Sequence, residues 1–174
     1  MVALEGHVAA DANETKHRDR LLQFLASDAA HYLRSNLAGH LTASALVLNH
    51  AGDSVLLLHH RKLDPWLQPG GHADGDENLE RVARKEVEEE TGIGDLTLVN
   101  TGIFDVDVHT IPERKGVPEH LHYDLRFLFW ASPGAVPLGN HEVKAVRWVP
   151  RSGVEEWVSD ESILRMVRKA DHYQ

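Results

Sequence analysis

Apolar side chains return every three or four residues in two segments near the ends of the chain, which places them on one face of an α-helix. From Thr15 to Asn36 this pattern predicts an amphipathic N-terminal helix. A second helix is predicted from about Asp160 to Ala170, with Ser159 at the N-cap position. The core face of this second helix is predicted to hold Ile163, Met166, Val167 and Ala170.

Short apolar runs between these two helices predict β-strands. Thr42–Leu48 and Ser54–His59 are joined by a turn that contains Gly52 and Asp53, an order that is typical of a β-hairpin. Further strand-forming runs cover Leu96–His109, His122–Ala131 and Glu142–Pro150. Because these strands alternate with helices, we predict an α/β fold with a mixed sheet between helical layers.

The composition fits one globular domain. With 174 residues and 42% hydrophobic content, the chain is long enough to bury a core. A net charge of −9 argues against nucleic acid as a partner, because binding to a phosphate backbone needs clustered lysine and arginine. The absence of cysteine excludes disulfides and thiolate metal ligands. No apolar run is long enough to cross a membrane and the N-terminus is too polar for a signal peptide, so we expect a cytoplasmic protein.

Glutamates crowd the end of a third predicted helix, which begins near Leu79. At about 100° per residue, Glu86 and Glu90 fall within roughly 20° of the direction of Leu79, and Glu89 lies about 80° to one side. The apolar residues of the same stripe are Val82, Ala83 and Val87. Half-buried carboxylates this close repel unless a cation lies between them, and Mg²⁺ or Mn²⁺ prefers oxygen ligands. A slightly rotated helix would instead leave every glutamate in solvent, so the spacing alone leaves both alternatives open.

The residues around this helix resemble the signature of the Nudix hydrolase superfamily, G-x5-E-x7-R-E-U-x-E-E-x-G-U, in which U is a bulky aliphatic residue. Every spacing is kept, and one fixed position differs, because Lys85 stands where the family has arginine. The matching residues are Gly71, Glu77, Lys85, Glu86, Val87, Glu89, Glu90, Gly92 and Ile93. The resemblance implies a Nudix-type α/β/α sandwich over residues 41–174, with residues 1–40 adding an N-terminal helix to the same domain.

The resemblance also implies an activity, namely hydrolysis of a nucleoside diphosphate linked to another moiety, with Mg²⁺ or Mn²⁺ as cofactor. The family's metal carboxylates correspond to Glu86, Glu89 and Glu90, and the backbone carbonyl of Gly70 is a further expected ligand. Glu77 corresponds to a glutamate at the helix start that supports the metal cluster or its waters. The metal would neutralise the diphosphate and lower the pKa of the attacking water.

Deprotonation of that water needs a general base. In the family this base is either a glutamate of the signature or an acid on a later loop, so the candidates are Glu89 and Glu142. Glu142 could equally be an ordinary loop residue. Lys85 supplies positive charge beside Glu89, but lysine cannot form the two parallel hydrogen bonds that arginine forms, so activity could be reduced rather than lost.

Several residues outside the helix could contact the substrate. The ring of Trp66 could stack on a base, although a partly buried loop aromatic is the simpler interpretation. His72 could reach a phosphate or could face solvent. Arg126 is a nearby positive charge that could meet a second phosphate, although such residues are most often solvated.

His120 and His122 are two residues apart, so they share a face if both lie on the strand, with Asp124 continuing that face. This arrangement suits either a second metal site or a wall that contacts phosphate, and polar edge-strand residues are the simplest interpretation. We favour substrate contact, because the spacing is short, no fourth zinc ligand is identified and the family chemistry needs no zinc.

Three other functions fit parts of the sequence. An isomerase of the isopentenyl diphosphate type needs a cysteine that the chain lacks. A sensor that binds a nucleotide without cleaving it usually loses signature glutamates, and all are present here. An RNA-end pyrophosphohydrolase would need a basic groove that the acidic composition does not indicate. The expected partner is therefore a small nucleoside diphosphate derivative. The N-terminal helix could also pack against a second subunit, which leaves a homodimer open.

Overall fold

The computed structural model describes residues 4, 7–27, 30–61, 65–114, 116–141 and 143–173, with the backbone alone at position 60. In chain order its helices and strands are α1 (Ala12–Leu25), β1 (Gly39–Leu48), β2 (Ser54–His60), β3 (Trp66–Leu67), β4 (Gly70–His72), α2 (Leu79–Thr91), β5 (Leu96–Leu98), β6 (Asp105–Ile111), β7 (His120–Ala131), β8 (Val143–Pro150), the 3-10 helix η1 (Arg151–Glu156), α3 (Glu161–Lys169) and the 3-10 helix η2 (Ala170–His172).

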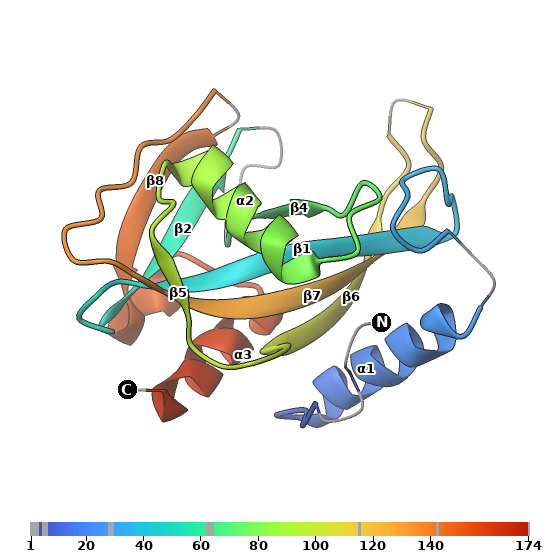
Figure 1. Cartoon of the computed structure of the whole chain (residues 1–174), viewed down its shortest axis with the longest axis horizontal. Helices are drawn as coiled ribbons and strands as arrows, with labels where there is room; N and C mark the ends of the chain where they lie inside the picture. The colour runs from blue at the N-terminus through green and yellow to red at the C-terminus, as the bar shows by residue number, and fades with distance from the viewer. Residues whose placement is uncertain are drawn as a thin grey trace.

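The strands form one mixed sheet with helices on both faces, which confirms the predicted α/β/α architecture (Figure 1). The strand order is β3-β2-β1-β7-β5, with β4 paired to β1, β6 to β7 and β8 to β2. β1 and β7 run parallel along their length, and the other pairs are antiparallel. The predicted hairpin is confirmed, because β1 and β2 are adjacent and Leu48 pairs with Val55.

The side chains of β1 alternate between the two layers. Leu41, Ala43, Ala45 and Val47 join the buried cluster that includes the apolar stripe of α2. Leu46 and Leu48 point to the opposite face, where they join the buried cluster that includes α3. On this second face the earlier positions of β1 are polar although buried, namely His40, Thr42 and Ser44. The polar half of the second face is therefore the part of the sheet that could build a site.

The N-terminal helix is shorter than the predicted Thr15–Asn36. Helix α1 begins after Asp11, whose side chain accepts a hydrogen bond from the backbone N–H of Glu14, and it ends at Leu25. Tyr32 lies beyond the helix, and its carbonyl accepts a hydrogen bond from the N–H of Gly75. Tertiary contact with the loop before α2 therefore overrides the helical periodicity. Ala29, which belongs to the predicted stripe, lies outside the described residues.

Helix α1 lies along the outer edge of β6 (Figure 1). The N–H groups of Val106 and Val108 on this edge strand donate to the Glu14 carboxylate at 3.2 Å and to His17 Nδ1 at 3.2 Å. Because an exposed strand edge invites pairing with other chains, these two contacts close the sheet at this side. Leu21 of the same helix is fully buried within the chain.

Two further boundaries differ from the predictions. The run Leu96–His109 is not one continuous strand, because β5 ends at Leu98 and β6 begins at Asp105, with the positive-φ residue Gly102 between them. The N-cap of α3 is Asp160 rather than Ser159, and its side chain accepts a hydrogen bond from the N–H of Ser162. The predicted core face of α3 is confirmed, since all four of its residues are buried. None of the helices described here is long and apolar enough to span a bilayer.

Candidate active site

A cavity of about 850 Å³ opens on the polar half of the sheet and extends to the C-terminal half of α2. Strand β4 contributes Gly70, Gly71 and His72, and α2 contributes Glu86 and Glu90. From β1, β6 and β7 come Thr42, Ser44, Asp107, His109, His122, Asp124 and Arg126. The wall thus combines carboxylates, imidazoles and hydroxyls, which suits a polar, charged ligand.

The two glutamates on the inner stripe of α2 lie as predicted. Glu90 is buried, with 8% of its surface exposed, and its carboxylate accepts a hydrogen bond of 3.1 Å from the N–H of Gly70. Glu86 is half-buried one turn earlier. Both side chains face β4, where Glu90 bonds to Gly70 and Glu86 lies against Gly71, so the alternative in which every glutamate of α2 is solvated is wrong.

Gly70 and Gly71 allow β4 to lie close to its neighbours. A Cβ atom on Gly70 would stand 2.4 Å from Ser44 Cβ, and one on Gly71 would stand 2.4 Å from the carboxylate of Glu86. Neither glycine has a positive φ angle, so they are needed here for space rather than for an unusual backbone conformation.

Glu89 lies outside this cluster. Its side chain is 55% exposed and pairs with Lys85 Nζ at 3.5 Å, so the expected third half-buried carboxylate is in fact at the surface. The offset of about 80° from the inner stripe turns it to the side of the helix. The backbone carbonyl of Glu89 accepts a hydrogen bond from the Asn140 side chain, on the loop before β8. Glu142, the other predicted general base, lies outside the described residues.

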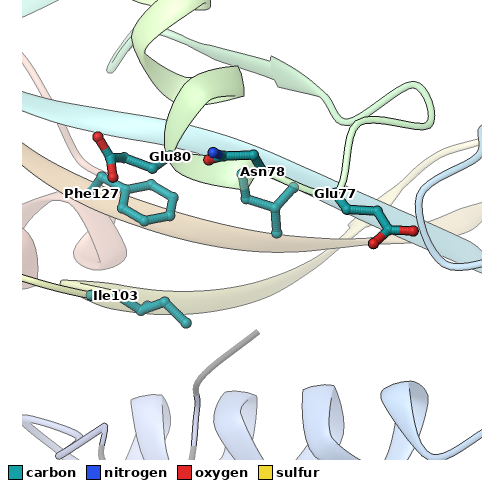
Figure 2. Close-up of a pocket in the computed structure, with 7 residues that line it drawn as sticks. Glu77, Asn78, Glu80, Ile103 and Phe127 are labelled. Atoms are coloured by element: carbon teal, nitrogen blue, oxygen red, sulfur yellow. The ribbon is translucent and has the colours of Figure 1, made fainter. Parts of the chain in front are cut away.

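Glu77 is exposed and borders a different, smaller cavity of about 420 Å³ near the start of α2. Figure 2 shows Asn78 between Glu77 and Glu80, with the carboxylate of Glu77 turned away from the Phe127 ring. The two cavities share no lining residue. The structure therefore does not bring Glu77 together with Glu86 and Glu90, and its support of a metal cluster stays a prediction.

Trp66 lies on β3, beside the cavity rather than in its lining. Its ring stacks on His59 at a centroid distance of 5.1 Å and meets Trp157 edge-on at 5.0 Å. The flanking residues Pro65 and Leu67 do line the cavity. Stacking of Trp66 on a base stays a prediction.

The sheet register collects histidines from separate parts of the chain. His122 of β7 pairs with His40 of β1 on one side and with His109 of β6 on the other. His72 of β4 lies next to this row, with its ring centroid 5.1 Å from His40 and 4.9 Å from His122. The ring of His120 is 5.1 Å from that of His40. The predicted face of His120 and His122 is therefore part of a five-histidine cluster.

Burial sets the charge of this cluster. It lowers the pKa of His72 to about 4 and that of His122 to about 2, because the imidazolium form loses hydration and the neighbouring rings add repulsion. Burial also lowers the pKa of His40. Burial opposes protonation of His109 as well, but its bond to Asp107 outweighs that effect and raises the pKa. Neutral rings are thus available on His40, His72 and His122 near pH 7.

Arg126 lies at the base of the cavity, where its guanidinium is 3% exposed. It forms ion pairs with Asp105 at 3.4 Å, Asp107 at 3.3 Å and Asp124 at 2.9 Å, and it also binds Ser162 of α3. Burial lowers the pKa of Arg126, but the three carboxylates outweigh it and raise the pKa above the ordinary value. Most of its donors are therefore used within the protein, and contact with a substrate phosphate stays a prediction.

Sequence reasoning missed several lining residues. Arg34 borders the cavity and forms an ion pair with Asp74. This bond raises the pKa of Arg34, and the charge of Glu86 adds to the rise. Thr42 and Ser44 donate hydrogen bonds to Asp124 at 2.9 and 2.7 Å. The sequence contains one indication of this bonding, because Thr42 and Ser44 are polar residues within the otherwise apolar β1 run. A buried polar side chain needs a hydrogen-bond partner.

Comparison with known proteins supports the interpretation of the fold. The family model of the NUDIX domain matches residues 39–167. The C. elegans Ap4A hydrolase in a binary complex has a TM-score of 0.62 and 20% identity, covering 76% of this chain and 96% of that one. The E. coli dihydroneopterin triphosphate pyrophosphohydrolase has a TM-score of 0.60 and 17% identity, and the match covers 76% of this chain and 95% of that one. The NUDIX domain of Shewanella oneidensis NrtR, complexed with ADP ribose, has a TM-score of 0.57 and 19% identity, and the match covers 87% of this chain and 96% of that one. Comparison with curated proteins found no match.

Proposed function

The chain belongs to the Nudix family, whose domain model spans most of its length, and from this premise we propose that it hydrolyses the pyrophosphate bond of a nucleoside diphosphate derivative with Mg²⁺ or Mn²⁺. The observation that carries the proposal is the convergence of Glu86 and Glu90 with the Gly70–Gly71 segment on one wall of the larger cavity.

The residues on this wall fit a hard divalent cation. Glu90 is buried and Glu86 is half-buried, and both offer oxygen ligands, as the backbone carbonyl of Gly70 does. The space above Gly71 is kept free of a side chain, so the Glu86 carboxylate can approach β4. Glu86, Glu90 and Gly70 are therefore the residues that would hold the ion. Glu89 is proposed as a further ligand, and its exposed side chain would have to turn from Lys85 toward the ion. A bound ion would neutralise the diphosphate and make water more acidic.

The remaining steps fall to side chains of the chain itself. The hydrogen bond from Gly70 fixes one carboxylate oxygen of Glu90 and so orients that side chain. Glu89, exposed beside the cluster, is our candidate for the base that removes a proton from the attacking water, and Glu142 is the alternative. Lys85 Nζ lies 3.5 Å from the carboxylate of Glu89 and places a positive charge beside it.

Other residues that line the cavity suit the phosphates of the substrate. Arg34 offers an exposed guanidinium that borders the cavity. His72 and His122 offer ring nitrogens in the same cavity. The structurally similar proteins include an Ap4A hydrolase and a NUDIX domain complexed with ADP ribose. In both compounds an adenosine is joined to another group through phosphates, and both belong to the substrate class proposed here.

The proposal is tested by product release from a panel of nucleoside diphosphate sugars, ADP-ribose, dinucleoside polyphosphates, nucleoside triphosphates and capped RNA, with and without Mg²⁺ or Mn²⁺. We expect metal-dependent turnover that falls at least 100-fold in Glu86→Gln. Glu88→Gln is the matched control, because Glu88 is an exposed glutamate of the same helix. Tight binding of a panel member without turnover would instead indicate a sensor, and turnover confined to capped RNA would indicate an RNA-end hydrolase.

A further inference from the structure

Strand pairing places three imidazoles from different strands around one point of the sheet. His40 of β1 is directly opposite His122 of β7, and His72 of β4 is opposite Thr42, one side-chain step along β1. One ring nitrogen of each histidine can be chosen so that the three atoms lie within 4.8 Å of one another. Nitrogens bound to a single ion at about 2.1 Å lie about 3.4 Å apart, so small rotations of the rings would complete the site.

Two of these nitrogens lack the partner that buried polar atoms normally have. His40 is 4% exposed, and its Nε2 has no hydrogen-bond partner among the described residues. The Nε2 of His122 is likewise buried without a partner in the described part of the chain. An unpaired polar atom in the interior is costly, so its presence at two adjacent rings calls for a ligand.

The hydrogen bond at Nδ1 of His40 determines that the lone pair of the ring is on Nε2. Its Nδ1 lies 3.4 Å from the carbonyl oxygen of Asn36. A carbonyl only accepts hydrogen bonds, so Nδ1 carries the proton and Nε2 presents its lone pair to the cluster. A backbone carbonyl behind a histidine ligand is a common way to orient the ring toward a metal.

We propose that His40, His72 and His122 form a site for a transition-metal ion of the zinc class, separate from the glutamate set. Imidazole nitrogens favour Zn²⁺, Co²⁺ and Ni²⁺, whereas carboxylate and carbonyl oxygens favour Mg²⁺ and Mn²⁺. On β7 alone the spacing argued against zinc, whereas β1 and β4 add His40 and His72 beside His122, a neighbourhood that the sequence does not reveal.

The proposed site borders the substrate cavity. His72 and His122 line the cavity wall, whereas His40 lies behind them. Three protein ligands leave a coordination position for a further group, and a phosphate oxygen of the substrate is the chemical class that this position would take. The histidine metal would thus bind substrate in the part of the cavity that β4 and β7 line with His72 and His122.

The test is binding of Co²⁺ and Zn²⁺ to chelator-treated, full-length protein. We expect one Co²⁺ per chain to show the visible absorption typical of nitrogen-ligated, four-coordinate cobalt and to be displaced by Zn²⁺, apart from any Co²⁺ at the glutamate set. His72→Gln and His122→Gln should weaken Zn²⁺ binding at least 100-fold and abolish the rise in Tm that Zn²⁺ causes. The control is His50→Gln, an exposed histidine in the turn between β1 and β2.

A second pair of variants separates the two metal sites. Glu86→Gln and Glu90→Gln should keep the cobalt spectrum and the Zn²⁺ affinity, even where they abolish hydrolysis. A cobalt spectrum and Zn²⁺ affinity that stay at the wild-type level in both histidine variants, or that are lost in the glutamate variants, would overturn the proposal. Because His72 is only half-buried, His72→Gln is expected to fold, and its near-UV circular dichroism verifies this.

Discussion

Gly70 and Gly71 shape the site through the space that they leave open. The first allows β4 to contact Ser44 of β1, and the second leaves room for the carboxylate of Glu86. A side chain at either position would push β4 away from a different neighbour. Adjacent glycines therefore have separable roles, one in packing and one in the chemistry of the site.

Gly71→Ala is expected to reduce turnover at least tenfold while changing the free energy of unfolding by less than about 1 kcal/mol, because the flexible Glu86 side chain can move aside. Gly70→Ala should cost about 1–3 kcal/mol, since its Cβ would also stand 2.9 Å from Ser44 Cα. Urea unfolding and turnover of both variants measure this difference. Equal losses of stability would contradict the assignment.

Glu14 is a fully buried carboxylate whose charge is satisfied by several donors. It accepts hydrogen bonds from the Ala10 N–H and the Val106 N–H, and it contacts His7 and Lys169 at 2.7 Å. Burial raises the pKa of Glu14, but the bonds from His7, Ala10 and Lys169 outweigh it and hold the pKa well below the ordinary 4.5. The folded protein therefore keeps this group ionised in acid.

The depressed pKa predicts how stability depends on pH. The unfolded chain takes up a proton at Glu14 as the pH falls below about 4.5, whereas the folded chain does not, so the stabilisation is complete above that pH and is lost below it. Urea unfolding at pH 7, 4.5 and 3 should show this loss in the wild type. In Glu14→Gln the decline should be shallower, and an identical decline would contradict the assignment.

Element boundaries and contacts could be predicted where the determinants are local. The stripe of α2 was correct, including the inward direction of Glu86 and Glu90, because helical geometry alone relates those positions. The length of α1 was wrong, because Tyr32 bonds to a distant loop. The histidine cluster was found only in part, because β1 pairs with a strand that is far away in the sequence, and periodicity contains no information on that pairing.

Helix α1 should depend on Glu14 for its attachment to the edge of β6. Glu14→Gln places an amide donor against Lys169 and leaves buried groups unpaired, so a loss of about 3 kcal/mol at pH 7 is expected. Asp19→Asn is the control, because the Asp19 side chain of the same helix is 55% exposed, and it should cost under about 0.5 kcal/mol. Chemical unfolding measures both values. A small loss in Glu14→Gln would show that α1 is held by apolar contacts alone.

At the scale of the molecule, one buried network of charges joins the layers. Arg126 binds three aspartates of β6 and β7, and Asp105 also binds Arg165 and Lys169 of α3. The same lysine reaches Glu14 of α1. The network lies beneath the polar half of the sheet and holds the floor of the cavity in place.

Arg126→Leu separates this structural role from a contact with substrate. Removal of the guanidinium takes one cationic partner from each of three buried carboxylates and should cost about 3–5 kcal/mol. Arg147→Leu, at an exposed position on β8, should be close to neutral. The free energy of unfolding and the KM of both variants distinguish the structural role from the contact with substrate. Unchanged stability with a raised KM would identify Arg126 as a phosphate contact instead.

The central claim is that the inward carboxylates of α2 hold the divalent ion on which hydrolysis depends. Electron paramagnetic resonance of free Mn²⁺, titrated into the wild type, Glu90→Gln and Glu88→Gln, tests this directly. We predict at least tenfold weaker Mn²⁺ binding in Glu90→Gln and binding within twofold of the wild type in Glu88→Gln. Equal affinities in all three proteins would contradict the assignment of the metal site.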